Sequence, residues 1–250
     1  MEFIPMHPAC MALHYGQALF EGMKATSGST KCDWIAIDSK TAWIYFIFLE
    51  LNYYSMAIFQ KSIIDKYLLT LDEGLIEAAF DTYKSVYVPK IARIRNLKEE
   101  QYQTQFLQDI FGSILGYTID PEAGYNIELE KKNESNSKKA DGAIVKENKV
   151  LGVIELKSNK TKNLDSVKDQ AFGYKNNHKG CNYVISSNFH KLRFYVDDAT
   201  EYEEFDLYNL DKESFKKFYL YLRKEGLLDK NLPKLLKEET KFHEEKISKE

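Results

Sequence analysis

Two carboxylates and a lysine near the middle of the chain have a spacing that suits metal-assisted hydrolysis. Asp141 lies in the apolar run Ala140–Val145, and Glu155 and Lys157 end a second apolar run, Val150–Lys157. A four-residue polar stretch separates the two runs, which is the pattern of a β-hairpin. The pattern therefore predicts that two neighbouring strands present all three side chains.

Alternation along the second strand places Glu155 and Lys157 together. Side chains of a strand point to opposite faces in turn, so residues two apart share a face. The predicted faces hold Leu151, Val153, Glu155 and Lys157 on one side, and Val150, Gly152, Ile154 and Leu156 on the other.

The position of Asp141 depends on the hairpin register, and two registers are open. In the first, Val145 pairs with Val150. Asp141 then faces Ile154, the neighbour of Glu155. A turn longer by one residue places Asp141 directly opposite Glu155. Both registers bring the two carboxylates to the same end of the hairpin.

The pair of Asp141 and Glu155 is suited to binding magnesium. Two close carboxylates repel, and each raises the proton affinity of the other. A hard divalent cation removes that penalty, and magnesium takes oxygen ligands while keeping several waters. One such water can attack a phosphodiester, and Lys157 beside it would offset charge on the attacked phosphate. The alternative is a strand that reaches the surface and simply ends in charged residues.

A polar pair on the next predicted helix, Asp165–Asn177, favours the same chemistry. Gln170 and Tyr174 are four residues apart and therefore lie on one helical face. A glutamine at that position can orient a metal-bound water or contact the substrate backbone. Capping and packing of the helix explain the pair as well when it is considered alone.

The region from residue 131 to residue 180 is basic, although the chain has a net charge of −3. Lysines bind phosphates without reading bases, so the region favours a polyanionic substrate. The alternative is a solvated loop. Six acidic residues stand against twelve lysines, which are Lys131, Lys132, Lys138, Lys139, Lys146, Lys149, Lys157, Lys160, Lys162, Lys168, Lys175 and Lys179.

The remaining sequence predicts an α/β sandwich, with a mixed sheet flanked by helices. Helical periodicity marks Lys61–Leu69, Glu73–Val88, Lys98–Leu115, Asp165–Asn177 and Ser214–Arg223. Besides the hairpin, strand patterns mark Tyr125–Leu129, Asn182–Ser186, Leu192–Val196 and Glu203–Leu207. A polar loop is predicted at Lys131–Lys139, and a solvated helix is predicted after Pro233.

Composition argues against several classes of protein. The three cysteines, Cys10, Cys32 and Cys181, lie far apart and have no zinc spacing, which favours a reducing, cytoplasmic setting. The most apolar segment, Ala42–Phe59, is interrupted by Glu50. Its uninterrupted part is shorter than the roughly 20 residues of a membrane-spanning helix, so no membrane is expected.

Several short motifs together carry a family resemblance. They are Asp141-Gly142-Ala143-Ile144, Val153-Ile154-Glu155-Leu156-Lys157, Gln170-Ala171-Phe172-Gly173-Tyr174 and Val184-Ile185-Ser186-Ser187-Asn188-Phe189, preceded by Glu99-Glu100-Gln101-Tyr102 and Ile114-Leu115-Gly116-Tyr117. This combination resembles the amino-terminal nuclease domain of type IIG restriction-modification enzymes, a domain of the PD-(D/E)xK type. The resemblance covers about Met56 to Glu250.

The resemblance implies a magnesium-dependent DNA endonuclease with the restriction-endonuclease-like fold. The site residues that it implies are Asp141 and Glu155 as metal ligands, Lys157 as the catalytic lysine, Gln170 as the supporting polar residue, and Glu100 and Tyr174 as further support. Glu100 corresponds to an acidic residue that some of these nucleases place near the metal.

One departure from the family is large. Type IIG enzymes continue into a methyltransferase and a target-recognition region, but this chain has no NPPY-like tetrapeptide and no glycine-rich nucleotide loop. We therefore expect a truncated enzyme that lacks these two partner regions. In this interpretation residues 56–230 are the nuclease domain, and residues 231–250 are the start of a helical linker.

The first 55 residues carry a different resemblance. Met6-His7-Pro8-Ala9 and the segment from Leu13 to Ala25 resemble an internal part of branched-chain aminotransferases, which use pyridoxal phosphate. Such an enzyme needs a Schiff-base lysine, a phosphate site and a large two-part fold, and nothing downstream supplies them. We expect residues 1–55 to be a foreign or read-through extension.

Three alternatives to the endonuclease stay open. The first is a PD-(D/E)xK module that holds DNA without cutting it, against which the intact Asp141, Glu155 and Lys157 argue. The second is an aminotransferase fragment, which the missing lysine context disfavours. The third is the cutting domain of a type I restriction subunit. Such a domain shares the Glu-x-Lys pattern of Glu155 and Lys157 and the glutamine–tyrosine pair of Gln170 and Tyr174.

Overall fold

The computed structural model describes residues 58–132 and 139–247 of the 250-residue chain. The chain divides into two units, Met1–Ser55 and Met56–Glu250, and all the described residues belong to the second. The aminotransferase-like segment at residues 4–25 lies outside the described residues. The interpretation of residues 1–55 as an extension therefore stays a prediction.

A six-stranded mixed sheet forms the centre of the described unit, with its strands in chain order. The strands are β1 (Ile127–Lys132), β2 (Lys139–Lys146), β3 (Lys149–Leu156), β4 (Tyr183–Ser187), β5 (Lys191–Val196) and β6 (Glu203–Asp206). Only the step from β3 to β4 is parallel. A parallel step needs a crossover connection, and helix α7 (Asp165–Lys175) supplies it.

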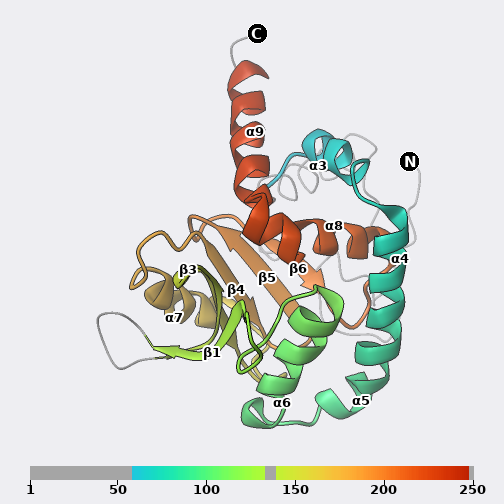
Figure 1. Cartoon of the computed structure of the whole chain (residues 1–250), viewed down its shortest axis with the longest axis vertical. Coiled ribbons are helices and arrows are strands. Elements are labelled where there is room, and N and C mark those ends of the chain that lie inside the picture. The colour runs from blue at the N-terminus through green and yellow to red at the C-terminus, as the bar shows by residue number, and fades with distance from the viewer. Residues whose placement is uncertain (1–57, 133–138, 248–250) are drawn as a thin grey trace, which may run out of the picture. The chain divides into compact units, whose positions relative to one another are not determined.

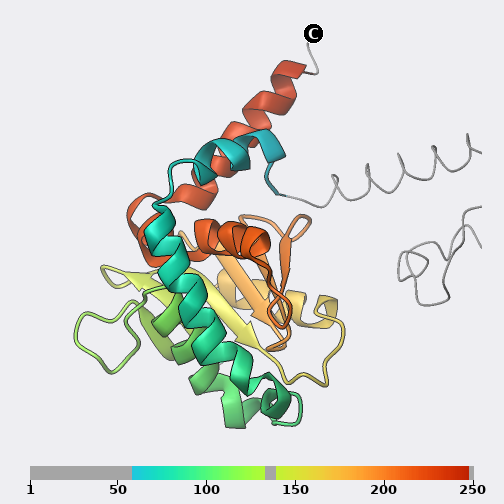
Figure 2. The same ribbon diagram turned by 90° about the vertical axis from the view of Figure 1, so that its right-hand side faces the viewer.

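Helices flank both faces of this sheet, as Figures 1 and 2 show. Helix α7 packs on one face, against β3 and β4. The other face carries α4, α6 and α8. The remaining bounds are α3 (Lys61–Leu68), α4 (Glu73–Thr82), η2 (Tyr83–Tyr87), η3 (Val88–Lys90), α5 (Ile91–Ile94), α6 (Glu99–Phe106), η4 (Leu107–Ile114), α8 (Lys212–Leu222), η5 (Glu225–Asp229) and α9 (Leu232–Ile247). The predicted α/β class with a mixed sheet and flanking helices is confirmed.

The two faces of the sheet have separate apolar cores. The core under α7 is small and includes Ala143, Val153, Ala171, Val184 and Tyr195. The other core is much larger, and it includes Ile144, Ile154, Leu156, Phe106, Ile110, Phe111, Phe189 and Phe215. The predicted helix Lys98–Leu115 is observed as α6 and η4, which bury Tyr102, Phe106, Ile110 and Phe111. Within the part of the chain that the structure describes, no helix is long and apolar enough to span a membrane.

A β-bulge lies in the hairpin of β2 and β3. Val145 pairs with Val150, but the next pair is Ile144 with Gly152. Leu151 therefore has no partner in β2 and is the extra residue of the bulge. Near the turn the hairpin follows the first of the two expected registers, and beyond the bulge it follows the second.

The bulge corrects the predicted faces of β3. Val150 packs with Val153 in the core under α7. Leu151 packs instead with Ile154 in the larger core. The prediction that Leu151 shares a face with Val153 is wrong because an extra residue reverses the alternation at that point. Residues after the bulge, including Glu155, keep the alternation that the sequence predicts.

The predicted polar loop at Lys131–Lys139 is shorter than expected. β1 continues through Lys132, and β2 begins at Lys139, because these ends pair with each other. Residues 133–138, between them, lie outside the described residues. The lysines at both ends of the predicted loop therefore belong to strands.

Helix α9 packs along only part of its length and then extends away from the sheet (Figure 1). Leu236 is buried, and Lys237 Nζ donates to the Val196 carbonyl at 2.6 Å and to Asp198 Oδ2 at 2.7 Å. Farther along, Phe242 is 73% exposed. The predicted solvated helix is therefore observed only in the outer part, since the first turns are fixed to β5.

Candidate active site

Asp141 and Glu155 lie at one end of the central hairpin. Gly142 pairs with Ile154, and the same register continued by one residue places Asp141 opposite Glu155. Asp141 Oδ2 accepts a hydrogen bond from the Leu156 amide at 2.7 Å. The sheet itself therefore fixes the position of both carboxylates.

Lys157 directly follows β3 and contacts Glu155. Its Nζ donates to Glu155 Oε1 at 2.7 Å and lies 3.4 Å from Glu99 Oε1. Its backbone amide donates to the Ser187 carbonyl at 2.8 Å, which ties the end of β3 to β4. The structure thus brings Asp141, Glu155 and Lys157 together, as the sequence predicts.

Helix α7 supplies a second donor to Glu155. Gln170 Nε2 donates to Glu155 Oε1 at 2.6 Å, and it lies 3.1 Å from the hydroxyl of Tyr174. Two donors therefore converge on one oxygen of Glu155. The other oxygen, Oε2, is buried and has no hydrogen-bond partner among the described residues. The predicted shared face of Gln170 and Tyr174 is the face that meets the site.

Helix α6 contributes two residues, Glu99 and Gln103, that the sequence did not predict as site residues. Glu99 lies beside Lys157, and the side chain of Gln103 hydrogen-bonds Asp141. Glu100, the residue expected at the site, is exposed instead.

Helix geometry explains why Glu99, and not the expected Glu100, lies beside Lys157. Each residue turns a helix by about 100°, so Glu99 lies about 60° from the buried Tyr102 and Glu100 about 160° from it. The buried face of α6 was therefore the signal that could have identified Glu99 and Gln103.

Burial sets the electrostatics of the two carboxylates. Glu155 is 1% exposed, and burial, with the charge of Asp141 as the next cause, raises its pKa to about 7. Burial also raises the pKa of Asp141 above its ordinary value. Burial opposes the charge of Lys157, but the hydrogen bond to Glu155 and the surrounding carboxylates outweigh it and raise the lysine pKa.

A magnesium ion fits these donors. Glu155 Oε2 is an unpartnered, buried acceptor, and Asp141 lies at the cross-strand position. Magnesium is often held by one or two carboxylates while it keeps several waters. Within residues 58–132 and 139–247, no group of three or more His, Cys, Asp and Glu side chains is arranged to hold a metal ion. Any ion here would therefore depend on two carboxylates and on water.

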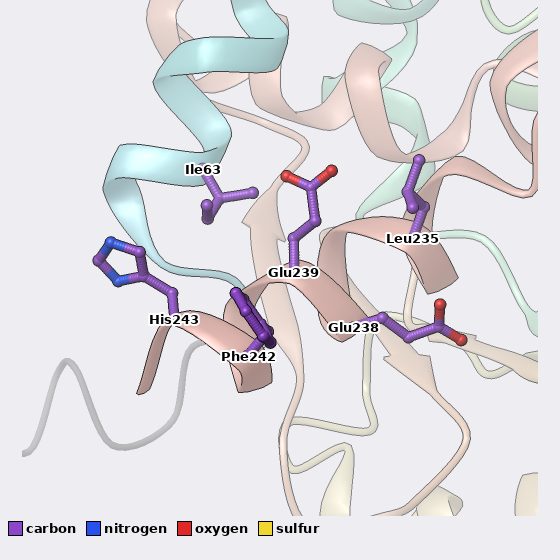
Figure 3. Close-up of a pocket in the computed structure, with 6 residues that line it drawn as sticks. All are labelled: Ile63, Leu235, Glu238, Glu239, Phe242 and His243. Carbon is purple, nitrogen blue, oxygen red and sulfur yellow. The ribbon is translucent and has the colours of Figure 1, made fainter. Parts of the chain in front are cut away.

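A cavity lies elsewhere in the unit, between α3 and α9 (Figure 3). Its volume is about 430 Å³. None of its lining residues belongs to the carboxylate site. They are Ile63, Leu235, Glu238, Glu239, Phe242 and His243. The carboxylate site is instead an arrangement of side chains at the end of β3.

Comparison of the chain with protein-family models, with curated proteins and with solved structures finds no match.

Proposed function

We propose that the described unit is the magnesium-dependent endonuclease domain of a restriction-modification enzyme, with the PD-(D/E)xK fold, and that it hydrolyses phosphodiester bonds of DNA. Glu155 is the residue that carries this proposal. Its buried carboxylate has one oxygen held by Lys157 and Gln170 and a second oxygen without a partner. An unpartnered buried carboxylate oxygen costs free energy, and a cation shared with Asp141 would offset that cost.

The roles of the side chains follow from their contacts. Asp141 and Glu155 would hold the ion, which would polarise a water for attack and neutralise charge on the phosphate. Lys157 keeps its proton, because its pKa is raised, and it therefore suits donation to a phosphate oxygen better than proton abstraction. Gln170 fixes Glu155 through its bond to Oε1. The water oxygen joins phosphorus while one ester bond breaks, which leaves a phosphate monoester and an alcohol.

We propose further that this unit works as part of a larger cytoplasmic enzyme. Methylation and choice of a DNA sequence would belong to methyltransferase and target-recognition regions outside these 250 residues. A reducing compartment suits Cys181, which is buried and free. Burial also raises the pKa of its thiol to about 12, so it is inert as a thiolate.

A second candidate is a DNA-binding module of the same fold that does not cut. The observation that favours it is the small donor set, since the described residues include no group of three or more side chains arranged for a metal. The two candidates differ in a single measurement, which is cleavage of DNA that is already bound.

The test is cleavage by the full chain fused to a sequence-specific DNA-binding partner, which removes any limit from weak affinity. With magnesium, the fusion should nick plasmid DNA near the partner's site. Asp141→Asn and Glu155→Gln should each lower the rate by at least about a hundredfold, because each removes a metal ligand. Asp229→Asn is the matched control, since this exposed carboxylate pairs with Lys146 away from the site.

Two results would decide against the endonuclease. A folded fusion that leaves DNA uncut in both magnesium and manganese would favour the binding module. Cleavage that persists in Asp141→Asn and Glu155→Gln would place the reaction at another site.

A further inference from the structure

The loop between β3 and α7 concentrates positive charge next to Lys157. From Leu156 to Leu164 the chain carries Lys157, Lys160 and Lys162 and no acidic residue. The first acid that follows is Asp165, whose Oδ1 lies 2.5 Å from Arg193 Nη1. Lys157 is paired with Glu155, so Lys160 and Lys162 are the lysines of the loop whose charge no acid of the loop balances.

Hydrogen bonds hold this loop in one conformation. The Thr161 amide donates to the Ser158 carbonyl at 2.9 Å, and Asn188 Nδ2 donates to the Thr161 carbonyl at 2.7 Å. Asn163 Oδ1 accepts from the Asp165 amide at 2.8 Å where α7 begins. A loop fixed at both ends and at its middle can present its outward side chains with little loss of conformational entropy on binding.

Lys160 and Lys162 are outward, charged side chains of the loop. Both are exposed, whereas Asn159 and Leu164 are buried. Neither lysine has an ion-pair partner among the described residues.

Three other lysines of the basic region are already paired. Lys131 pairs with Glu128 at 2.8 Å, Lys139 with Glu130 at 2.7 Å and Lys146 with Asp229 at 3.2 Å. An anion can therefore bind Lys160 and Lys162 without displacing an acidic side chain.

We propose that Lys160 and Lys162 bind backbone phosphates of the DNA strand near the one that Lys157 contacts, and so set the strand across the carboxylate site. The inference rests on the proposed function. Lys160 and Lys162 are three and five residues from Lys157, a reach of at most roughly 11 and 18 Å along an extended chain. Successive phosphates advance about 3.4 Å per strand, so this reach covers a few nucleotides. Such contacts position DNA and carry no sequence information.

The test measures how the affinity of the full chain for a short DNA duplex depends on salt. Calcium replaces magnesium so that the duplex stays intact. Each phosphate contact contributes about 0.9 to the slope of log affinity against log salt. The Lys160→Gln/Lys162→Gln double variant should therefore make the negative slope shallower by about 1.8, and it should weaken binding at low salt. The matched control is Lys61→Gln/Lys241→Gln, which removes the same charge from exposed positions on α3 and α9.

The outcomes separate this inference from the proposed function. An unchanged slope in the Lys160→Gln/Lys162→Gln variant, or an equal fall in the control variant, overturns the phosphate contacts even where the fusion cuts DNA. A shallower slope confined to the Lys160→Gln/Lys162→Gln variant supports the contacts even where the fusion does not cut. A chain that binds no DNA overturns the phosphate contacts, whereas cleavage by the fusion still decides the proposed function.

Discussion

Glu155 joins the elements of the candidate site. It is carried by β3, lies opposite Asp141 of β2 and accepts hydrogen bonds from Lys157 and from Gln170 of α7. Burial makes its charge costly, and the nearby carboxylate of Asp141 adds to that cost. These contacts give each neighbouring residue a distinct and measurable role.

Replacing Gln170 with alanine should weaken the site without removing it. Residues that orient a metal ligand typically contribute tenfold to a hundredfold to metal affinity or activity. We expect Gln170→Ala to lower the cleavage rate by about that factor and to recover part of it at high magnesium. Tyr174→Phe is the control, because it removes only the hydroxyl that contacts Gln170. A loss as large as that of Glu155→Gln, with no recovery, would make Gln170 more than an orienting residue.

Glu99 and Glu100 form a matched pair of variants on α6. Glu99 contacts Lys157 at 3.4 Å, whereas Glu100 is exposed. A partly exposed ion pair contributes about 0.2–1 kcal/mol, so Glu99→Gln should slow cleavage by about threefold. Glu100→Gln should leave the rate unchanged. The measurement is single-turnover cleavage by the fused chain, and a larger effect at Glu100 would reverse the assignment.

At the scale of elements, the sequence predicts the helices, the strands and the hairpin better than it predicts which face of an element each residue occupies. Alternation, apolar runs and polar turns locate every described strand. A strand with one exposed face shows its period in its residue types, and a strand buried on both faces, such as β4, is apolar along most of its length. The bulge at Leu151 leaves no such sign, because Val150 and Leu151 are both apolar and either can face a core. Glu99 and Glu100 were likewise the same residue type, so only the packing of Tyr102 separates them.

Strand β6 holds the start of the described unit through a half-buried carboxylate. Glu203 Oε1 accepts from the Ile58 amide at 3.0 Å, and burial raises the pKa of Glu203 to about 7. A folded pKa above the unfolded value gives stability that is complete below about pH 4.5 and is lost as pH rises through about 7. Glu203→Gln should remove this loss and be more stable than the unchanged chain by about 1–3 kcal/mol at pH 8.

Urea unfolding at pH 5 and pH 8 measures this effect. Glu204→Gln is a control of opposite sign. Burial opposes ionisation of Glu204, but hydrogen bonds from Lys191 and Arg193 outweigh it and hold its pKa below the usual range. Glu204→Gln should therefore lose stability at pH 8. A Glu203→Gln chain that is less stable than the unchanged chain at pH 8 would show that the charged form of Glu203 is needed.

At the scale of the whole molecule, the fold class follows from local patterns that agree with one another. Strands, one crossover helix and amphipathic helices leave few ways to bury both faces of a mixed sheet. The site depends on finer contacts, since Gln103 reaches Asp141 only once α6 lies against the sheet. Sequence alone therefore predicts the hairpin residues of the site and Gln170 of α7, and it misses the residues that α6 supplies.

The boundary of the unit yields a prediction that two shortened chains can test. Ile58 and Phe59 are 2% and 3% exposed and belong to the larger core. A chain that begins at Met56 keeps both side chains and the bond from Ile58 to Glu203, so its free energy of unfolding in urea should match that of the full chain. A chain that begins at Lys61 loses both, and burial of two such side chains contributes about 3–6 kcal/mol. If removal of residues 1–55 alone destabilises the fold to the same extent, the independent unit begins earlier than Met56.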